Sequence, residues 1–188
     1  MLKPLQEDRK YVEITGFKNV QVKDAEKLLT AVRKEMPADA EVQLFDADLV
    51  ASWQHLYFAV LNSLMAFRTK RNISKSVAVE VMLYASAQRQ IKKAIELIGV
   101  KKTTANVAAV IVTEKAEPVK IALAAIANCV GAEPDETVLE LTKRKVQRIG
   151  RAFAVSDLEL ETVASEGDAA DALVACVVER VALLSTQL

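Results

Sequence analysis

The chain has little of what breaks helices or builds enzyme sites. Its 188 residues include five glycines, four prolines and one histidine, and aromatic residues make up 5%. So few helix breakers favour helices with short connections. The hydrophobic content of 52% predicts a core of Val, Leu, Ile and Ala. All five glycines are isolated, so a glycine-rich phosphate-binding loop is excluded.

The length of the chain, its cysteines and its apolar runs predict its domain organisation and its compartment. A chain of this length matches one domain, and we predict a single domain over residues 1–188, with residues 1–10 as an N-terminal extension. Cys129 and Cys176 lack Cys-x-x-Cys spacing, which indicates free thiols in a reducing compartment. We expect no secretory signal, because the first residues include acids and lack an apolar run, and the sequence has no apolar run of about 18 residues, as a membrane span needs. We therefore expect a cytoplasmic protein without a membrane partner.

Hydrophobic periodicity predicts both helices and strands. β-branched residues and alternation indicate short strands, and the unbroken apolar run at residues 106–113 indicates a buried central strand. Asp24 and Ser156 precede helical patterns as N-caps, and Ser156 with Glu159 forms a capping-box pattern. We predict an α/β (α+β) fold, a helix-rich single domain packed around a small mixed β-sheet. The expected strands lie within 10–22, 41–45 and 106–113, and the expected longer helices are 25–36, 53–67, 75–86, 88–98, 120–130, 135–149 and 169–185.

The residues offer little support for catalysis. His55, the single histidine, lies in an apolar helical pattern, where a structural hydrogen-bonded role is the commoner one. Asp46 and Asp48 are expected to cap the helix that follows them. No nucleophile arrangement or metal-ligand cluster is recognisable, so we predict a protein that is not an enzyme and has no cofactor or metal. A small-molecule enzyme of unknown type on an α/β fold remains the alternative.

Basic residues gather in one region. Residues 49–113 contain nine Lys or Arg and two acids, Glu80 and Glu96. Such a cluster can grip phosphates, and neighbouring Gln side chains can reach base edges or sugars. The alternative is the solvated face of an ordinary helix, and residues 143–151 form a second basic cluster. Arg89, Lys92 and Lys93 are expected to share one helix side. The candidate RNA-binding residues are Arg68, Lys70, Arg71, Lys75, Gln88, Arg89, Lys92 and Lys93.

The last helical pattern is apolar over more than one stripe. A terminal helix with two apolar faces can dock on a partner protein, and burial in its own core is the alternative. The candidate docking residues are Leu173, Val177, Val181 and Leu184.

Several motifs resemble one known family. The segments Asn72–Ser76 and Leu83–Ile95, with Glu80 between them, resemble the signature of the smallest kinase-associated subunit of the KEOPS complex. In animals this family is the p53-related-protein-kinase-binding protein. The stretches 45–50, 55–60 and 179–184 agree in order and spacing. One position departs from the pattern, because the family usually has Gly where this chain has Ala87. Alanine there is expected to permit a continuous or merely kinked helix.

The resemblance implies a mixed α/β fold and a non-catalytic role. It implies binding to the N-terminal lobe of the small atypical kinase of the KEOPS complex. It also implies a part in threonylcarbamoylation of the tRNA adenosine beside the anticodon, which another subunit, the threonylcarbamoyl transferase, performs. Some archaeal members are understood to bind the single-stranded 3′ end of tRNA, a role that fits the basic region.

Overall fold

The computed structural model describes residues 2–164 and 168–186. The chain forms two compact units, each built from two separate segments. The sheet unit consists of residues 1–47 and 99–139, and the helical unit of residues 48–98 and 140–188. The prediction of one domain over residues 1–188 stays a prediction.

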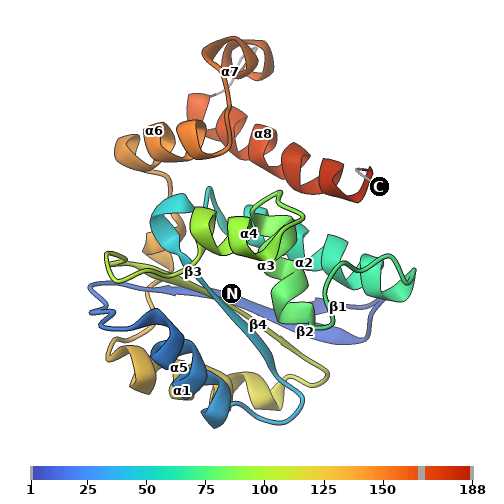
Figure 1. Cartoon of the computed structure of the whole chain (residues 1–188), viewed down its shortest axis with the longest axis vertical. Helices are drawn as coiled ribbons and strands as arrows, with labels where there is room; N and C mark the ends of the chain where they lie inside the picture. Colours follow the sequence, from blue (N-terminus) through green and yellow to red (C-terminus); the bar gives the residue numbers. More distant parts are fainter. Residues whose placement is uncertain (1, 165–167, 187–188) are drawn as a thin grey trace. The chain divides into compact units, whose positions relative to one another are not determined.

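The sheet unit is built on four strands in the order β1-β2-β4-β3 (Figure 1). Every neighbouring pair is antiparallel, so the α+β class is confirmed but the prediction of a mixed sheet is wrong. The reason is strand order: β2 and β3 run parallel to each other, but β4 lies between them. The strands are β1 (Leu2–Leu5), β2 (Lys10–Phe17), β3 (Glu41–Asp46) and β4 (Val107–Thr113).

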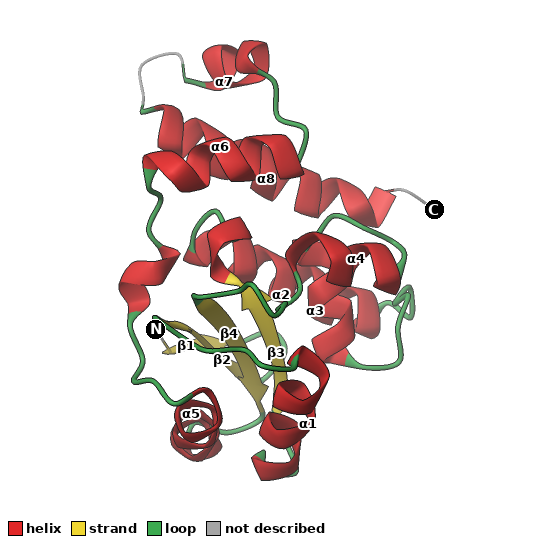
Figure 2. Ribbon diagram, turned by 60° about the vertical axis from the view of Figure 1, so that its left-hand side comes forward, coloured by secondary structure: helices red, strands yellow, loops and turns green. Residues whose placement is uncertain are grey.

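Two helices, α1 (Ala25–Glu35) and α5 (Glu117–Val130), lie on the same side of this sheet (Figure 2). The expected cap is present, because Asp24 accepts a hydrogen bond from the Lys27 N–H. Side chains from the sheet and both helices form one core cluster that excludes water and stabilises the unit. β4 is buried along its whole length, which confirms the predicted central strand.

The helical unit contains six α-helices in its described part. α8 packs against α2, α3, α6 and α7. Ser52 caps α2 by accepting from the His55 N–H, and Ser76 caps α3 by accepting from the Val79 N–H. The helices are α2 (Trp53–Arg68), α3 (Val77–Ala85), α4 (Ile91–Ile98), α6 (Lys143–Ala152), α7 (Asp157–Val163) and α8 (Ala169–Leu183). The 3-10 turns η1 (Ala47–Leu49), η2 (Glu136–Leu139) and η3 (Leu184–Thr186) complete the regular structure of the described residues.

Two predicted helices are shorter than expected. Residues 88–90 are not helical, because Ala87 takes a left-handed conformation with φ 50° and ends the α3 segment. The expected helix 135–149 is instead η2 followed by α6, since Thr142 in extended backbone caps a new helix at the Lys145 N–H. In both places a local cap ends or restarts the helix although the apolar period continues.

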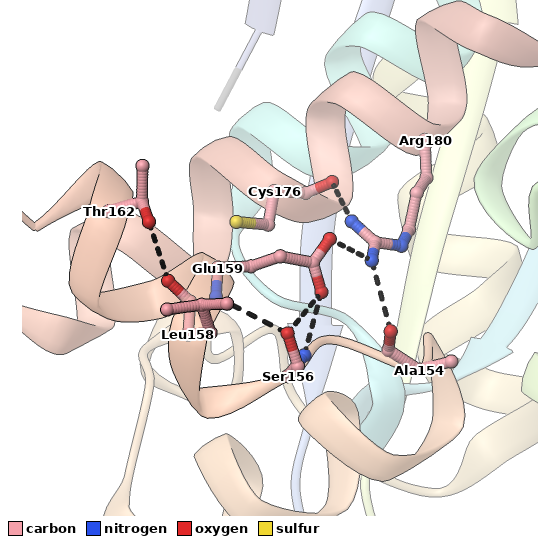
Figure 3. A network of polar contacts seen from close by, with 7 residues as sticks. All are labelled: Ala154, Ser156, Leu158, Glu159, Thr162, Cys176 and Arg180. Carbon is pink, nitrogen blue, oxygen red and sulfur yellow. Dashed lines mark hydrogen bonds and ion pairs between the residues drawn. The ribbon is translucent and has the colours of Figure 1, made fainter.

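Arg180 connects α8 with α7 and with the turn that follows α6 (Figure 3). Its guanidinium donates to the carbonyl oxygens of Cys176 and Ala154 and forms an ion pair with Glu159 at 2.8 Å. Glu159 also completes the predicted capping box with Ser156. The Ser156 N–H, the Arg180 guanidinium and the Ser156 hydroxyl together lower the pKa of Glu159 to about 2. These contacts attach α7, which has no buried residue, to α8.

Candidate functional site

A pocket of about 290 Å³ lies in the helical unit, bordered by α2, α3 and η3. Its wall includes the buried side chains of Ala66, Tyr84 and Leu184 and the half-buried Ile73. Its rim carries two exposed arginines, Arg71 and Arg89. The interior is therefore mostly apolar, and the mouth is cationic.

The end of α2 places Arg71. Lys70 is left-handed with φ 57°, and its N–H bonds to the Phe67 carbonyl. The Arg71 N–H bonds to the Ala66 carbonyl at 2.8 Å. These two bonds form a Schellman cap, which satisfies carbonyl groups at the helix end and turns the chain. Arg71 then lies beside the negative end of the helix dipole, where a cation is favoured.

The end of α3 places Arg89 in the same manner. Ala87 is left-handed, its N–H bonds to the Tyr84 carbonyl, and the Gln88 N–H bonds to the Leu83 carbonyl at 3.0 Å. A non-glycine residue pays a steric cost in this conformation. The expectation that Ala87 permits a continuous or merely kinked helix is therefore wrong. The helix ends before Ala87, which takes the left-handed conformation that glycine usually takes at a helix end.

Glu80 holds the segment that joins α2 to α3. Its side chain is fully buried, and its carboxylate accepts hydrogen bonds from the N–H groups of Ile73 and Ser74. The one acid between Arg68 and Lys93 is therefore an internal anchor for the pocket wall, and Ile73 lines the pocket directly.

Tyr84 lies one helical turn after Glu80 on α3 and lines the pocket. Its side chain is 4% exposed. Burial, with a further contribution from the charge of Glu80, raises the pKa of Tyr84. The phenol therefore stays protonated at neutral pH and is able to donate a hydrogen bond.

The eight candidate RNA-binding residues all belong to the helical unit, but the structure does not bring all of them to one pocket. Arg71 and Arg89 meet at the pocket. Gln88 lines a second pocket of about 260 Å³ together with Arg180. Lys92 forms an exposed ion pair with Glu96. The remaining four, Arg68, Lys70, Lys75 and Lys93, are exposed.

The prediction that Arg89, Lys92 and Lys93 share one side of a helix is wrong. Arg89 precedes α4, which begins at Ile91. Lys92 and Lys93 are consecutive on α4 and so point in different directions. Arg89 belongs instead with Arg71, from which it is separated by 18 positions in sequence.

The second basic cluster on α6 is partly occupied by internal contacts. Arg144 and Arg148 both donate to the Asp48 carboxylate. Asp48 therefore does not cap α2, as was expected, since Ser52 does. Lys145 is 4% exposed. Of the cluster, Lys143 and Arg151 remain as exposed cations without an ion pair among the described residues.

His55 has the structural role that was predicted. It is fully buried; its Nε2 lies 2.7 Å from the Ala85 carbonyl, and its Nδ1 accepts from the Ala51 N–H at 3.2 Å. Nδ1 therefore carries no proton and Nε2 donates. Burial is the main cause that lowers the pKa of His55, to about 4, while the Ala85 carbonyl opposes it and the charge of Lys145 adds to it.

The four candidate docking residues on α8 face the interior. Leu173, Val177 and Val181 are fully buried and Leu184 is 1% exposed, and α8 packs on α2. The expectation that these side chains form a free surface is wrong, because their stripe is the core face of the helix. A second apolar stripe does exist on α8: it consists of the half-buried Val174 and Val178 and the exposed Ala175 and Ala182.

Residues 2–164 and 168–186 contain neither a metal-ligand group nor a membrane-spanning helix. Within them, no group of three or more His, Cys, Asp or Glu side chains could hold a metal ion. Among the helices of the same residues, none has both the length and the apolar character needed to cross a bilayer.

Sequence reasoning did not find most of the pocket. Tyr84 and Ile73 belong to the recognised signature, but neither was selected as a site residue. Asn62 and Met65 on α2, and residues 185–186 after α8, also line it. No local pattern marks them, because the pocket exists only once α2, α3 and η3 are packed together.

The family model for kinase binding protein CGI-121 matches residues 17–185, so the chain belongs to this family. A curated relative is the regulatory protein Cgi121 of Methanocaldococcus jannaschii. It is 34% identical over 113 residues, which are 60% of this chain and 70% of that protein.

Proposed function

We propose that this protein is a non-catalytic subunit that binds a small protein kinase and holds the single-stranded 3′ end of tRNA. It does so in a KEOPS-type complex, in which another subunit transfers the threonylcarbamoyl group to the adenosine beside the anticodon. The complex acts in the cytoplasm. The observation that carries the RNA part is the convergence of Arg71 and Arg89 on one pocket.

The pocket suits a strand end for physical reasons. Cations at its rim match the phosphates of an RNA backbone, and its apolar wall offers a face for an unstacked base. Double-stranded RNA displays its bases in grooves, so a concave site of this size matches only an unpaired nucleotide. Lys70 and Lys75, which are exposed in the same region, extend the positive surface along the backbone.

The kinase part rests on the family. The family model and the relative are described as kinase-binding and regulatory, respectively. We assign the contact to the outer stripe of α8, formed by Val174, Ala175, Val178 and Ala182, because the core stripe is occupied. Small apolar residues on an exposed helix face permit close approach of a partner.

The enzyme alternative has no observation in its favour. The single histidine donates to a backbone carbonyl and has a pKa of about 4, so it is a poor general base at neutral pH. Cys129 and Cys176 both have a raised thiol pKa through burial, the opposite of an activated nucleophile.

The test is tRNA binding by a paired set of variants. The double variant Arg71→Ala/Arg89→Ala should bind more weakly than wild type, with a log–log salt slope shallower by about 1.4, from roughly 0.7 for each lost phosphate contact. Lys143→Ala/Arg151→Ala removes the same charge from the same unit outside the pocket and should leave the slope nearly unchanged. Equal losses of tRNA affinity in both variants would show that Arg71 and Arg89 act only as solvated surface charges.

A further inference from the structure

Hydroxyl side chains share the arginine-rimmed pocket of α2, α3 and η3 with Arg71 and Arg89. The hydroxyl residues Thr69, Ser185 and Thr186 line this pocket, and all three are exposed. They come from two places that are distant in sequence, the C-cap of α2 and the turn η3. An alcohol beside two guanidinium groups suits phosphorylation, because a phosphate ester accepts charge-assisted hydrogen bonds from arginine.

The turn η3 holds its hydroxyls more loosely than the end of α2 does. Ser185 donates to the Ala182 carbonyl and Thr186 to the Leu183 carbonyl, each at 2.8 Å. Thr69 donates to two carbonyls, and its backbone N–H is bonded within the cap of α2. A three-residue 3-10 turn opens at lower cost than a capped α-helix, because its hydrogen-bond geometry is poorer. Ser185 and Thr186 are therefore the hydroxyls that another protein's active site reaches more easily.

We propose that Ser185 and Thr186 form a phosphoacceptor site for a serine/threonine protein kinase, and that one phosphate there closes the pocket to RNA. The phosphoryl donor is ATP. The bond between its γ-phosphorus and the bridging oxygen breaks, and the phosphorus bonds to the side-chain hydroxyl oxygen. The hydroxyl proton passes to a base of the kinase, and ADP leaves. This inference rests on the proposed function, since the kinase is the one that the chain is proposed to bind, in a family described as kinase-binding.

The charges around η3 favour the phosphate ester. A phosphorylated serine or threonine carries a charge of about −1.5 to −2 at neutral pH. The turn follows the C-terminal end of α8, where the helix dipole disfavours an anion. Arg71 and Arg89 line the same pocket, and charge-assisted hydrogen bonds from two guanidinium groups outweigh the effect of one dipole. Once these groups hold the ester, they no longer contact a phosphate of RNA, so the modification competes with RNA from within the chain.

The first measurement incubates the full chain, in complex with its co-purified kinase, with ATP and Mg²⁺ and maps the phosphate by mass spectrometry. With equal amounts of kinase in each complex, we expect one phosphate on Ser185 or Thr186 and its loss in Ser185→Ala/Thr186→Ala. Thr162→Ala is the matched control and should keep the phosphate. Thr162 is also exposed and also donates to a backbone carbonyl, but it lies on the acidic helix α7. An unmodified chain, or a phosphate on Thr69 instead, would overturn the site.

The second measurement compares tRNA binding by the phosphorylated and the unmodified chain. Phosphorylation should weaken binding roughly 20-fold at about 0.1 M salt, the electrostatic contribution of two phosphate contacts at about 0.7 log units each. The same modification of Arg71→Ala/Arg89→Ala should cause no further loss, because the groups that hold the ester are absent. Ser185→Asp/Thr186→Asp should weaken tRNA binding in the same direction, and Thr162→Asp should leave it unchanged.

The two measurements separate this inference from the proposed function. If the unmodified chain binds both the kinase and tRNA but accepts no phosphate, or if the phosphorylated chain binds tRNA as tightly as the unmodified one, this inference alone is wrong. A full further loss in the phosphorylated Arg71→Ala/Arg89→Ala variant would also overturn it, since the arginines would then have no part. If no kinase co-purifies, or if the unmodified chain binds no tRNA, the proposed function fails and this inference fails with it.

Discussion

The Glu80 carboxylate accepts the Ser74 N–H at 2.7 Å, and this bond fixes the segment between α2 and α3. The same carboxylate takes the Ile73 N–H with both oxygens, at 2.9 and 3.1 Å. Ile73 lines the arginine-rimmed pocket, and Tyr84 follows Glu80 by one turn on α3. A buried acid therefore shapes a site whose rim is basic.

Replacing Glu80 with Gln should loosen this segment. The amide is isosteric but cannot accept all three bonds, and hydrogen bonds to a charged group are worth about 1.5–3 kcal/mol each. We expect the free energy of unfolding to fall by roughly 1–3 kcal/mol in denaturant titration, and tRNA affinity to fall with it. Glu96→Gln removes an equally negative but exposed side chain and should change stability by no more than about 0.5 kcal/mol. Equal effects would show that Glu80 is no anchor.

Replacing Ala87 with Gly should stabilise the protein. Ala87 has φ 50°, a conformation that costs an L-residue about 1–2 kcal/mol and glycine almost nothing. Glycine also makes the unfolded chain more flexible, which offsets part of this gain. We expect a net gain of roughly 0.5–1 kcal/mol in the free energy of unfolding. Ala85→Gly, within α3, should instead lose about 1 kcal/mol. A loss at both positions would contradict the cap geometry.

The free energy of unfolding should decrease as the pH is lowered, because of His55. Its folded pKa of about 4 lies below its ordinary value of 6.5, so the unfolded chain takes up a proton first as the pH falls. The contribution is complete above pH 6.5 and is lost as the pH falls toward 4. We expect a loss of about 2–3 kcal/mol between pH 7 and 4.5, at roughly 1.4 kcal/mol per pKa unit. The slope should flatten in His55→Gln, and an unchanged slope would contradict the account.

Kinase binding should depend on the outer stripe of α8. The variant Ala175→Glu/Ala182→Glu places charges on two exposed positions and should keep the wild-type circular dichroism and melting temperature. We expect it to lose co-purification with the kinase. Ile95→Glu, an exposed apolar position on α4, serves as the control and should retain the kinase. Retained binding by the α8 variant would move the interface elsewhere.

The sequence predicted the elements better than their ends or their arrangement. Val107–Thr113 was recognisable as a buried strand because its apolar run is continuous, and α2 because it is a long apolar stretch without any acid. β1 was missed: Pro4 interrupts a short segment, and an edge strand tolerates proline where a central one does not. The antiparallel order depends on β4 lying between β2 and β3, which no local pattern encodes.

The candidate site was predicted only in part. Charge density located Arg71 and Arg89, since a cluster of cations is visible along the chain. The two arginines meet at the pocket because Lys70 and Ala87 take left-handed conformations at the ends of α2 and α3. Alanine rarely takes this conformation, so the sequence does not predict a helix end at Ala87. Leu184 was selected as a docking residue because both faces of α8 are apolar, and the packed structure alone shows which face is core.

The measurement that tests the account most directly is photo-crosslinking of tRNA with a photoreactive group on its 3′-terminal nucleotide. The account predicts crosslinks to the pocket, at Asn62, Met65, Ile73, Tyr84 or Arg89, and their loss in Arg71→Ala/Arg89→Ala. Crosslinks at Lys143 or Arg151 on α6, or crosslinks that persist in the double variant, would contradict the claim that this pocket holds the strand end.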